Sequence, residues 1–195
     1  MLSLCLKLIS AVGLNYFSAQ QCKKNAEQHL ERPYTPVYDI IHIQVNRWNV
    51  HIPDYLLAFS GICNVIKYII MKYPYIYKDL NNNITILTYS LLLRSITTRL
   101  TIVPTCMKRQ TVETKNIFEK IFTSTHDLMF SGHTIVFIFF GRLIEEHYNK
   151  NIIFYVTSHL IQYIFPISLI LSRQHYTIDI VVATIVYNYF TLVVN

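Results

Sequence analysis

A short run of small and polar residues before an apolar block could hold and protonate a phosphate group. The run is Ser131-Gly132-His133-Thr134. The start of a helix exposes unpaired backbone N–H groups and a partial positive charge, which suit phosphate oxygens. Gly132 would allow a close backbone approach, and His133 can carry a proton near neutral pH. The alternative is an ordinary capped helix with a histidine at the membrane interface.

A second cluster pairs a histidine with an aspartate, in the segment His175-Tyr176-Thr177-Ile178-Asp179. If this segment is helical, His175 and Asp179 lie one turn apart on one face. An aspartate bonded to one ring nitrogen fixes the histidine tautomer and raises the basicity of the other nitrogen. A nucleophilic or basic histidine needs this arrangement. The alternative is a structural His–Asp pair that stabilises the start of a helix.

An arginine in the middle of an apolar run is the third feature that indicates chemistry. Arg94 would cost several kcal/mol at membrane depth unless it were paired or faced water. Thr97 lies on the same helical face, and a guanidinium suits the geometry of a phosphate group. Arg99 could instead reach the nearer interface with its long side chain. The remaining histidines are interpreted as solvated or packed. We expect no metal or other cofactor, because the sequence has no HExxH motif, calcium-binding loop or clustered carboxylates.

The composition indicates that lipid surrounds the helices that carry these groups. Hydrophobic residues make up 52% of the chain, and the mean hydropathy is +0.32. Charged residues make up only 14%, against about 25% in soluble domains. The net charge of +6 comes from Lys and Arg that lie mostly between apolar blocks. This placement favours contact with anionic lipid head groups, and we expect no nucleic-acid partner.

The apolar blocks predict an all-α fold, a polytopic membrane helical bundle with about six transmembrane helices. Each block is near the length that a helix needs to cross the hydrocarbon core. The linkers are too short for a second domain, so residues 1–195 are predicted to form a single membrane-embedded domain. The first block is interpreted as a retained helix in preference to a cleaved signal. The predicted spans are Leu2–Ala19, Tyr55–Ile70, Ile84–Val103, Leu128–Ile144, Ile152–Leu171 and Ile178–Val194.

Four stretches of the chain, from about Pro36 onward, resemble the sphingomyelin synthase family within the wider lipid phosphatase superfamily. They follow the family's order and look like its PLPD-type, Y-R-x-x-T, D-x3-S-G-H-T and H-Y-T-x-D motifs. Tyr38, Leu93 and the pair Thr125-His126 depart from those motifs, which leaves the choice of substrate open. The four stretches are Pro36–His42, Leu93–Thr97 with Pro104, Asp127–Thr134 and His175–Ile180.

This resemblance implies an enzyme that moves a phospho-alcohol head group from a glycerophospholipid to ceramide and releases diacylglycerol. It implies that His175 is the nucleophile, Asp179 its partner and His133 the general acid and base. The head group could be phosphocholine, phosphoethanolamine or phosphoinositol. The expected substrate-binding residues are Arg94, Asp127, Ser131, Gly132, Thr134 and Tyr176.

The sequence leaves alternatives open for the cellular location of the protein and for the reaction that it catalyses. By the resemblance we expect a multi-pass integral membrane protein of the Golgi, the endoplasmic reticulum or the plasma membrane, with its active site on the lumenal or exoplasmic face. The distribution of Lys and Arg between the loops mildly favours the cytosol for that face. The main rival activity is a lipid phosphate phosphatase, a hydrolase with the same His/His/Asp core. A catalytically inactive membrane scaffold is the second rival.

Overall fold

The computed structural model describes residues 2–29, 37–71, 76–101, 131–145 and 152–194. Every regular element in these ranges is helical, as the sequence predicts. The elements are α1 (Leu2–His29), α2 (Ile40–Gln44), α3 (Ile52–Met71), α4 (Ile76–Leu100), α6 (Gly132–Glu145), α7 (Ile152–His159), the π-helical turn η1 (Leu160–Ile164), α8 (Phe165–Leu171) and α9 (Thr177–Val194).

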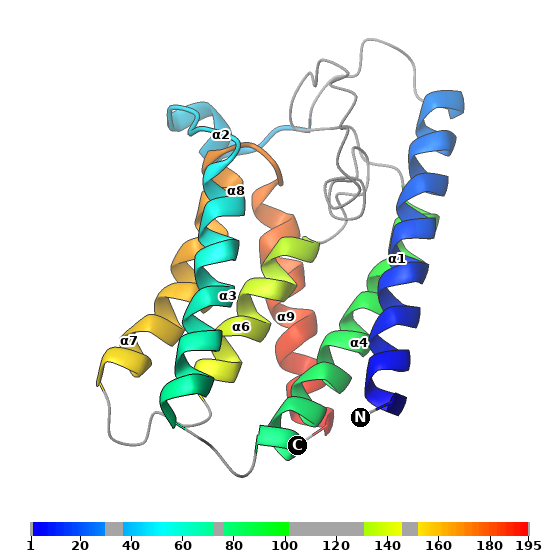
Figure 1. The fold of residues 1–195 in the computed structure, drawn as a ribbon. Coiled ribbons are helices and arrows are strands. Elements are labelled where there is room, and N and C mark those ends of the chain that lie inside the picture. Colours follow the sequence, from blue (N-terminus) through cyan, green and yellow to red (C-terminus); the bar gives the residue numbers. More distant parts are fainter. Residues whose placement is uncertain (1, 30–36, 72–75, 102–130, 146–151, 195) are drawn as a thin grey trace.

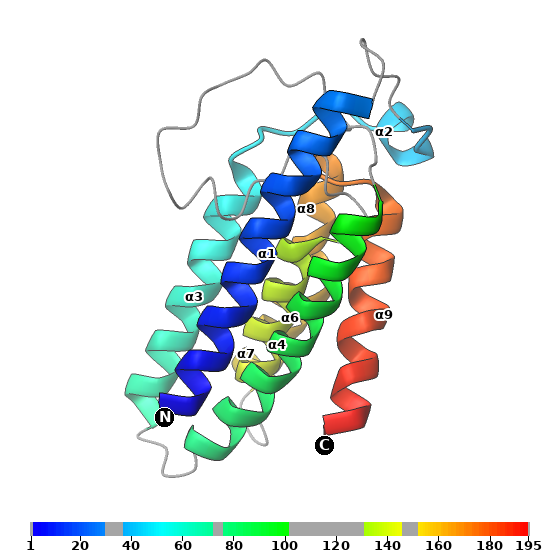
Figure 2. The same cartoon turned by 90° about the vertical axis from the view of Figure 1, so that its right-hand side faces the viewer.

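The long helices form a bundle in which α6 is central. It packs against α3, α4 and α9 and against the segment formed by α7, η1 and α8. The longest helix, α1, lies along α4 at the edge of the bundle, as Figures 1 and 2 show. One end of the bundle gathers the short helix α2, the starts of α3, α6 and α9, and the end of α4 (Figure 1). Both termini lie at the opposite end.

The interior has two apolar clusters, one on each side of α6. Ile135 and Ile138 of α6 pack in the first cluster with Leu91 of α4 and Tyr187 of α9. Phe137 packs in the second cluster, with apolar residues of η1, α8 and α9. Small polar residues allow close helix contacts, a common feature of helix interfaces in membranes. Those with no exposed surface include Ser18, Ser60, Ser90 and Ser158.

Two helical stretches in the described part are long and apolar enough to cross a membrane. They are Ile152–Leu171 and Thr177–Val194, which match the fifth and sixth predicted spans. Large apolar side chains such as Ile62, Ile185 and Leu192 are exposed on the outside of the bundle. These features favour a membrane protein. The number of six crossings and the single domain over residues 1–195 stay predictions.

The fifth predicted span changes its winding before its proline. Pro166 lacks an N–H group and would clash with the carbonyl group four residues earlier in a regular helix. The π-helical turn η1 ends just before this point, and α8 begins with the proline near its first position. The wider turn therefore accommodates Pro166 within a continuous helical stretch.

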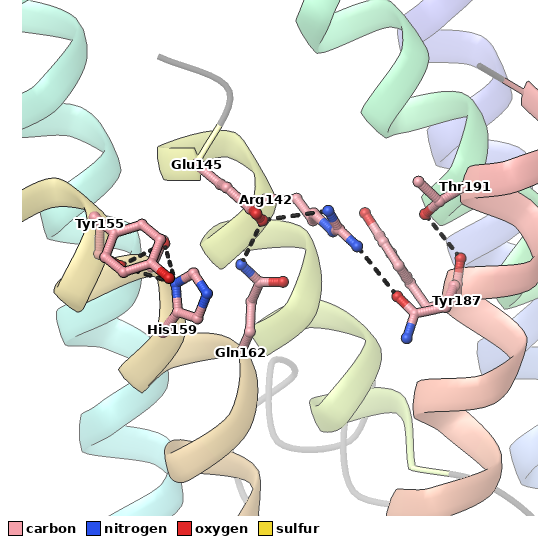
Figure 3. Close-up of polar contacts among 9 residues, drawn as sticks. Arg142, Glu145, Tyr155, His159, Gln162, Tyr187 and Thr191 are labelled. Atoms are coloured by element: carbon pink, nitrogen blue, oxygen red, sulfur yellow. Dashed lines mark hydrogen bonds and ion pairs between the residues drawn. The ribbon is translucent and has the colours of Figure 1, made fainter. Parts of the chain in front are cut away.

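A polar cluster ties α6, η1 and α9 together at the end of α6 (Figure 3). The guanidinium of Arg142 donates to Glu145 at 3.3 Å and to Asn188 of α9 at 3.3 Å. The amide of Gln162 in η1 donates to the same Glu145 carboxylate at 2.9 Å. Gly141 makes room for Gln162, since a β-carbon there would overlap the Cγ atom of Gln162. These hydrogen bonds lower the cost of keeping the cluster within an apolar bundle. In the described residues Nε of Arg142 and Oε1 of Gln162 have no hydrogen-bond partner.

Candidate active site

A buried histidine–aspartate pair lies where α8 turns into α9. His175 precedes α9, so the pair does not lie on one regular helix as the spacing predicted. The contact still forms: Nδ1 of His175 lies 3.3 Å from Oδ2 of Asp179. The same carboxylate oxygen accepts the backbone N–H of Tyr176 at 2.9 Å. Both side chains are buried, which limits their freedom to leave this geometry.

His133 faces this pair from the start of α6. The ring centroids of His133 and His175 lie 6.3 Å apart, with the planes inclined by 62°. Two hydrogen bonds fix the start of α6 beside α9. The backbone N–H of Ser131 donates to the carbonyl of Asp179 at 3.2 Å, and the Ser131 hydroxyl accepts the N–H of Thr134 at 3.1 Å. The Ser131 side chain thus caps the helix that carries His133.

Arg94 reaches the same place from α4. A β-carbon built on Gly132 would lie 3.2 Å from Nε and 3.3 Å from Cζ of Arg94. The guanidinium therefore lies directly against the backbone at the start of α6. Its Nη1 donates to Oδ1 of Asn15 on α1 at 2.5 Å. Arg94 is only 6% exposed, so its charge is held next to the histidines within the bundle.

The segment before α2 is bound to the start of α9 through Asp39. One carboxylate oxygen accepts the backbone N–H of Thr177 at 2.7 Å, and the other accepts the Thr177 hydroxyl at 3.1 Å. The second oxygen also accepts the N–H of Ile41 at 3.0 Å. Asp39 therefore caps α2 and α9 together. The first of the four resembling stretches meets the last one at this residue.

Electrostatics at Asp39 favour its charged form. Partial burial alone would raise the pKa of Asp39. The hydrogen bonds from Thr177, the nearby His42 and the N–H of Ile41 outweigh this effect and hold the pKa below its ordinary value. The carboxylate is thus matched to the partial positive charge at the start of α9.

Tyr176 and His42 extend this contact around the histidine–aspartate pair. The Tyr176 hydroxyl accepts the backbone N–H of Val37 at 2.9 Å, and its ring lies 5.7 Å from that of His42. Nε2 of His42 lies 3.2 Å from the carbonyl oxygen of His175. The sequence predicted that His42 is interfacial or solvated, whereas in the structure it is half-buried and contacts the backbone carbonyl of His175.

Asp54 is an acidic residue of the site that sequence reasoning did not identify. It lies in the first turn of α3, and its Oδ1 lies 3.8 Å from Nε2 of His133. Its side chain is 52% exposed. An acidic residue in the first turn of a helix usually interacts with the positive end of the helix dipole. The local sequence therefore gave no indication of the contact with His133.

The structure thus gathers nearly all of the predicted site at one end of the bundle. His133, His175, Asp179, Arg94, Ser131, Gly132 and Tyr176 are connected by the contacts above. Thr134 is fully buried, and its hydroxyl oxygen has no hydrogen-bond partner within the described ranges. Asp127 lies outside the described residues. In the described ranges, no group of three or more His, Cys, Asp and Glu side chains could hold a metal ion.

This arrangement has the parts of a phosphoryl-transfer site. The Nδ1 atom of His175 is engaged by a carboxylate, so Nε2 is the nitrogen available for attack. A second histidine lies close enough to exchange a proton with an oxygen on the same phosphorus. A guanidinium and a helix N-terminus can stabilise the charge that develops on the phosphoryl oxygens.

Residues 125–195 match the family model described as PAP2 superfamily C-terminal. The PAP2 match covers α6 to α9 and therefore both histidines and the aspartate. It supports the lipid phosphatase superfamily, whose members are usually phosphatases or phosphotransferases. The PAP2 match and the apolar helices together support a role in lipid metabolism at a membrane. No curated protein matches the chain.

Proposed function

We propose that the chain transfers a phospho-alcohol head group from a glycerophospholipid to ceramide through an intermediate on His175. The observation that carries the proposal is the geometry of three side chains. A carboxylate engages Nδ1 of His175, and the ring of His133 lies 6.3 Å from the His175 ring. The PAP2 match, which covers all three residues, supports phosphoryl-transfer chemistry for them.

In the first half-reaction, Nε2 of His175 attacks the phosphorus of the donor lipid. The N–P bond forms, and the bond between phosphorus and the glycerol oxygen breaks. His133, protonated at this stage, gives its proton to that oxygen, and diacylglycerol leaves. Asp179 stabilises the positive charge on His175, while Arg94 and the start of α6 face the phosphoryl oxygens.

The second half-reaction reverses these events with a different alcohol. His133, now neutral, takes the proton of the primary hydroxyl of ceramide. The ceramide oxygen attacks phosphorus, the N–P bond breaks, and His175 returns to its starting form. One phosphodiester replaces another, so no nucleotide or other cofactor enters the balance. The three head groups left open by the sequence remain candidates for the transferred group.

A lipid phosphate phosphatase is the second candidate, because the PAP2 match fits hydrolases equally well. In that case water replaces ceramide in the second half-reaction. Two sequence departures favour the transferase. Lipid phosphate phosphatases resemble one another in a K-x6-R-P clamp and an S-R-x5-H spacing. Here Lys24 is one residue too far from Arg32-Pro33, and only Gln174 separates Ser172-Arg173 from His175.

Cell-free synthesis into liposomes tests the proposal. The liposomes contain fluorescent ceramide and one phospholipid donor at a time, with His175→Ala as the matched control. A fluorescent product that carries a head group, absent in the variant, would support the transferase and name the donor. Phosphate release from phosphatidic acid without any ceramide product would establish the hydrolase instead.

A further inference from the structure

An apolar groove runs along the outside of the bundle next to the candidate active site. Its volume is about 590 Å³, within the range of about 300–1,000 Å³ that is usual for ligand sites. Phe139, Phe140 and Leu143 of α6 form its floor. One face of α3 forms a wall, and Leu80 of α4 lines the end farther from the histidines. Figure 1 shows α6 passing between α3 and α4.

The wall formed by α3 continues the helix face that carries Asp54. Ala58, Gly61, Val65 and Tyr68 line the groove and follow Asp54 at four, seven, eleven and fourteen residues, which places them in one stripe. Ala58 therefore lies about 6 Å below Asp54 along the helix axis, and Tyr68 about 21 Å below it. The groove begins roughly one turn below the contact between Asp54 and His133 and extends toward the opposite end of the bundle.

The groove offers little to a polar ligand. Its lining is apolar apart from Asn64 and the hydroxyl of Tyr68. The amide nitrogen of Asn64 already donates to the backbone carbonyls of Ser60 and Phe140, at 3.0 Å each. The ammonium group of the buried Lys67 donates to the backbone carbonyl of Leu143. This hydrogen bond engages the charged group away from the groove. A long, apolar, open groove at this depth suits a hydrocarbon chain.

We infer that this groove holds the acyl chain of the ceramide acceptor, an inference that rests on the proposed function. The acceptor hydroxyl must meet His133, and the chain must begin a few ångströms from that hydroxyl, where Ala58 opens the groove. The diacylglycerol of the first half-reaction leaves from the same position. Ceramide therefore enters a groove that the glycerol half of the donor has just vacated. Contact with Phe139 and Phe140 would then orient the hydroxyl toward the phosphorylated histidine.

A series of bulky substitutions along α3 tests this inference through the chain length of the acceptor. Ala58→Phe, Gly61→Phe and Val65→Phe place a phenyl ring at successive depths of about 6, 10 and 16 Å below Asp54. The readout is kcat/KM for hexanoyl and palmitoyl ceramide in the liposome assay. Val65→Phe should lower kcat/KM for the palmitoyl acceptor roughly tenfold and leave the hexanoyl acceptor unchanged, as expected for losing the burial of a few methylene groups. Ala58→Phe should lower both.

Ile66→Phe is the matched control, because Ile66 is an exposed neighbour on α3 that does not line the groove. The control should keep the wild-type ratio between the two acceptors. Equal ratios in every variant, or the same change in Ile66→Phe, would overturn the inference and indicate bulk lipid or a second copy of the chain in the groove.

If the phenylalanine variants do not accumulate, Gly61→Ala and Val65→Leu replace them, since a β-carbon on Gly61 makes an ordinary 3.8 Å contact with Phe140. These variants should shift the same ratio in the same direction, and an unchanged ratio would overturn the inference.

The proposed function and the groove fail in different ways. Wild-type protein that transfers no head group to either ceramide would contradict the proposed function and, with it, the inference. If the wild-type protein transfers the head group to both ceramides, but the variants along α3 do not discriminate between the two acyl lengths, only the inference about the groove is contradicted.

Discussion

The guanidinium of Arg94 lies against the α-carbon of Gly132, so that a methyl group at position 132 would lie 3.2 Å from Nε. This contact joins the arginine of α4 to the helix start that carries His133. A side chain at position 132 would push the guanidinium away, so glycine keeps Arg94 close to the start of α6. The sequence suggested Arg94 and the start of α6 as two separate phosphate contacts. In the structure they adjoin each other and form one surface.

Gly132→Ala should displace Arg94 by a few tenths of an ångström and weaken transfer. We expect kcat to fall about tenfold, the equivalent of about 1.4 kcal/mol of transition-state stabilisation. Gly132→Val should remove activity, while both variants insert into liposomes normally. Gly141→Ala is not a suitable control, because it would collide with Gln162. Gly13→Ala is suitable, because its β-carbon would meet nothing within 4 Å. Full activity of Gly132→Val would contradict the close approach.

Asn15 should control how Arg94 presents its charge. Nη1 of Arg94 donates to this residue at 2.5 Å, and hydrogen bonds to charged groups contribute about 1.5–3 kcal/mol. Asn15→Ala should therefore lower kcat/KM for the donor lipid about tenfold or more. Asn15→Asp keeps an acceptor oxygen and should retain most of the activity. If both variants behave alike, the hydrogen bond does not orient Arg94.

Asp39 should make the junction of α2 and α9 sensitive to acid. Its pKa is lowered by the hydrogen bonds from Thr177, despite partial burial. A lowered pKa in the folded state means that the stability from this carboxylate is present above its ordinary value of about 3.9 and is lost as pH falls through the lower folded-state value. In detergent, the wild-type protein should have a higher Tm than Asp39→Asn at neutral pH. The two should converge below about pH 4. A difference that stays constant as the pH falls well below 4 would contradict the role of the charge.

Asp54 and His133 should be energetically coupled. Oδ1 of Asp54 lies 3.8 Å from Nε2 of His133, although the carboxylate is half exposed and the pairing is correspondingly weak. Asp54→Asn should lower kcat about three- to tenfold in the wild-type background, roughly 1 kcal/mol. The same substitution should have no further effect in a His133→Ala background. An equal loss in both backgrounds would show that Asp54 acts elsewhere.

The proximity of His133, His175 and Asp179 was partly predictable because their local spacing is informative, while their catalytic roles stay a prediction. His175 and Asp179 are four residues apart, and a Gly-His pair at the start of an apolar run indicates a helix start that can bind anions. The prediction of an all-helical fold is confirmed for the described ranges, since long apolar blocks leave the backbone few other solutions.

Contacts between distant segments were not predictable. Asp54, Asn15 and His42 enter the site only because α3, α1 and α2 pack next to α6 and α9, and no local pattern encodes that packing. The helices α1, α3 and α4 are also longer than the spans predicted for them. α1 continues to His29, about ten residues past the predicted span, where the thiol of Cys22 faces the carbonyl of Thr101 across the helix interface at 3.7 Å. Tertiary contacts of this kind stabilise polar helical turns that hydropathy alone assigns to a linker.

The most direct test of the central claim is a single-turnover experiment with a donor phospholipid and no acceptor. The account predicts a burst of diacylglycerol, at most one per protein molecule, that then stops. The peptide containing His175 should carry the added mass of the phospho-alcohol, and His175→Ala should show neither signal. Continuous release of diacylglycerol without ceramide, or a burst that persists in His175→Ala, would contradict transfer through His175.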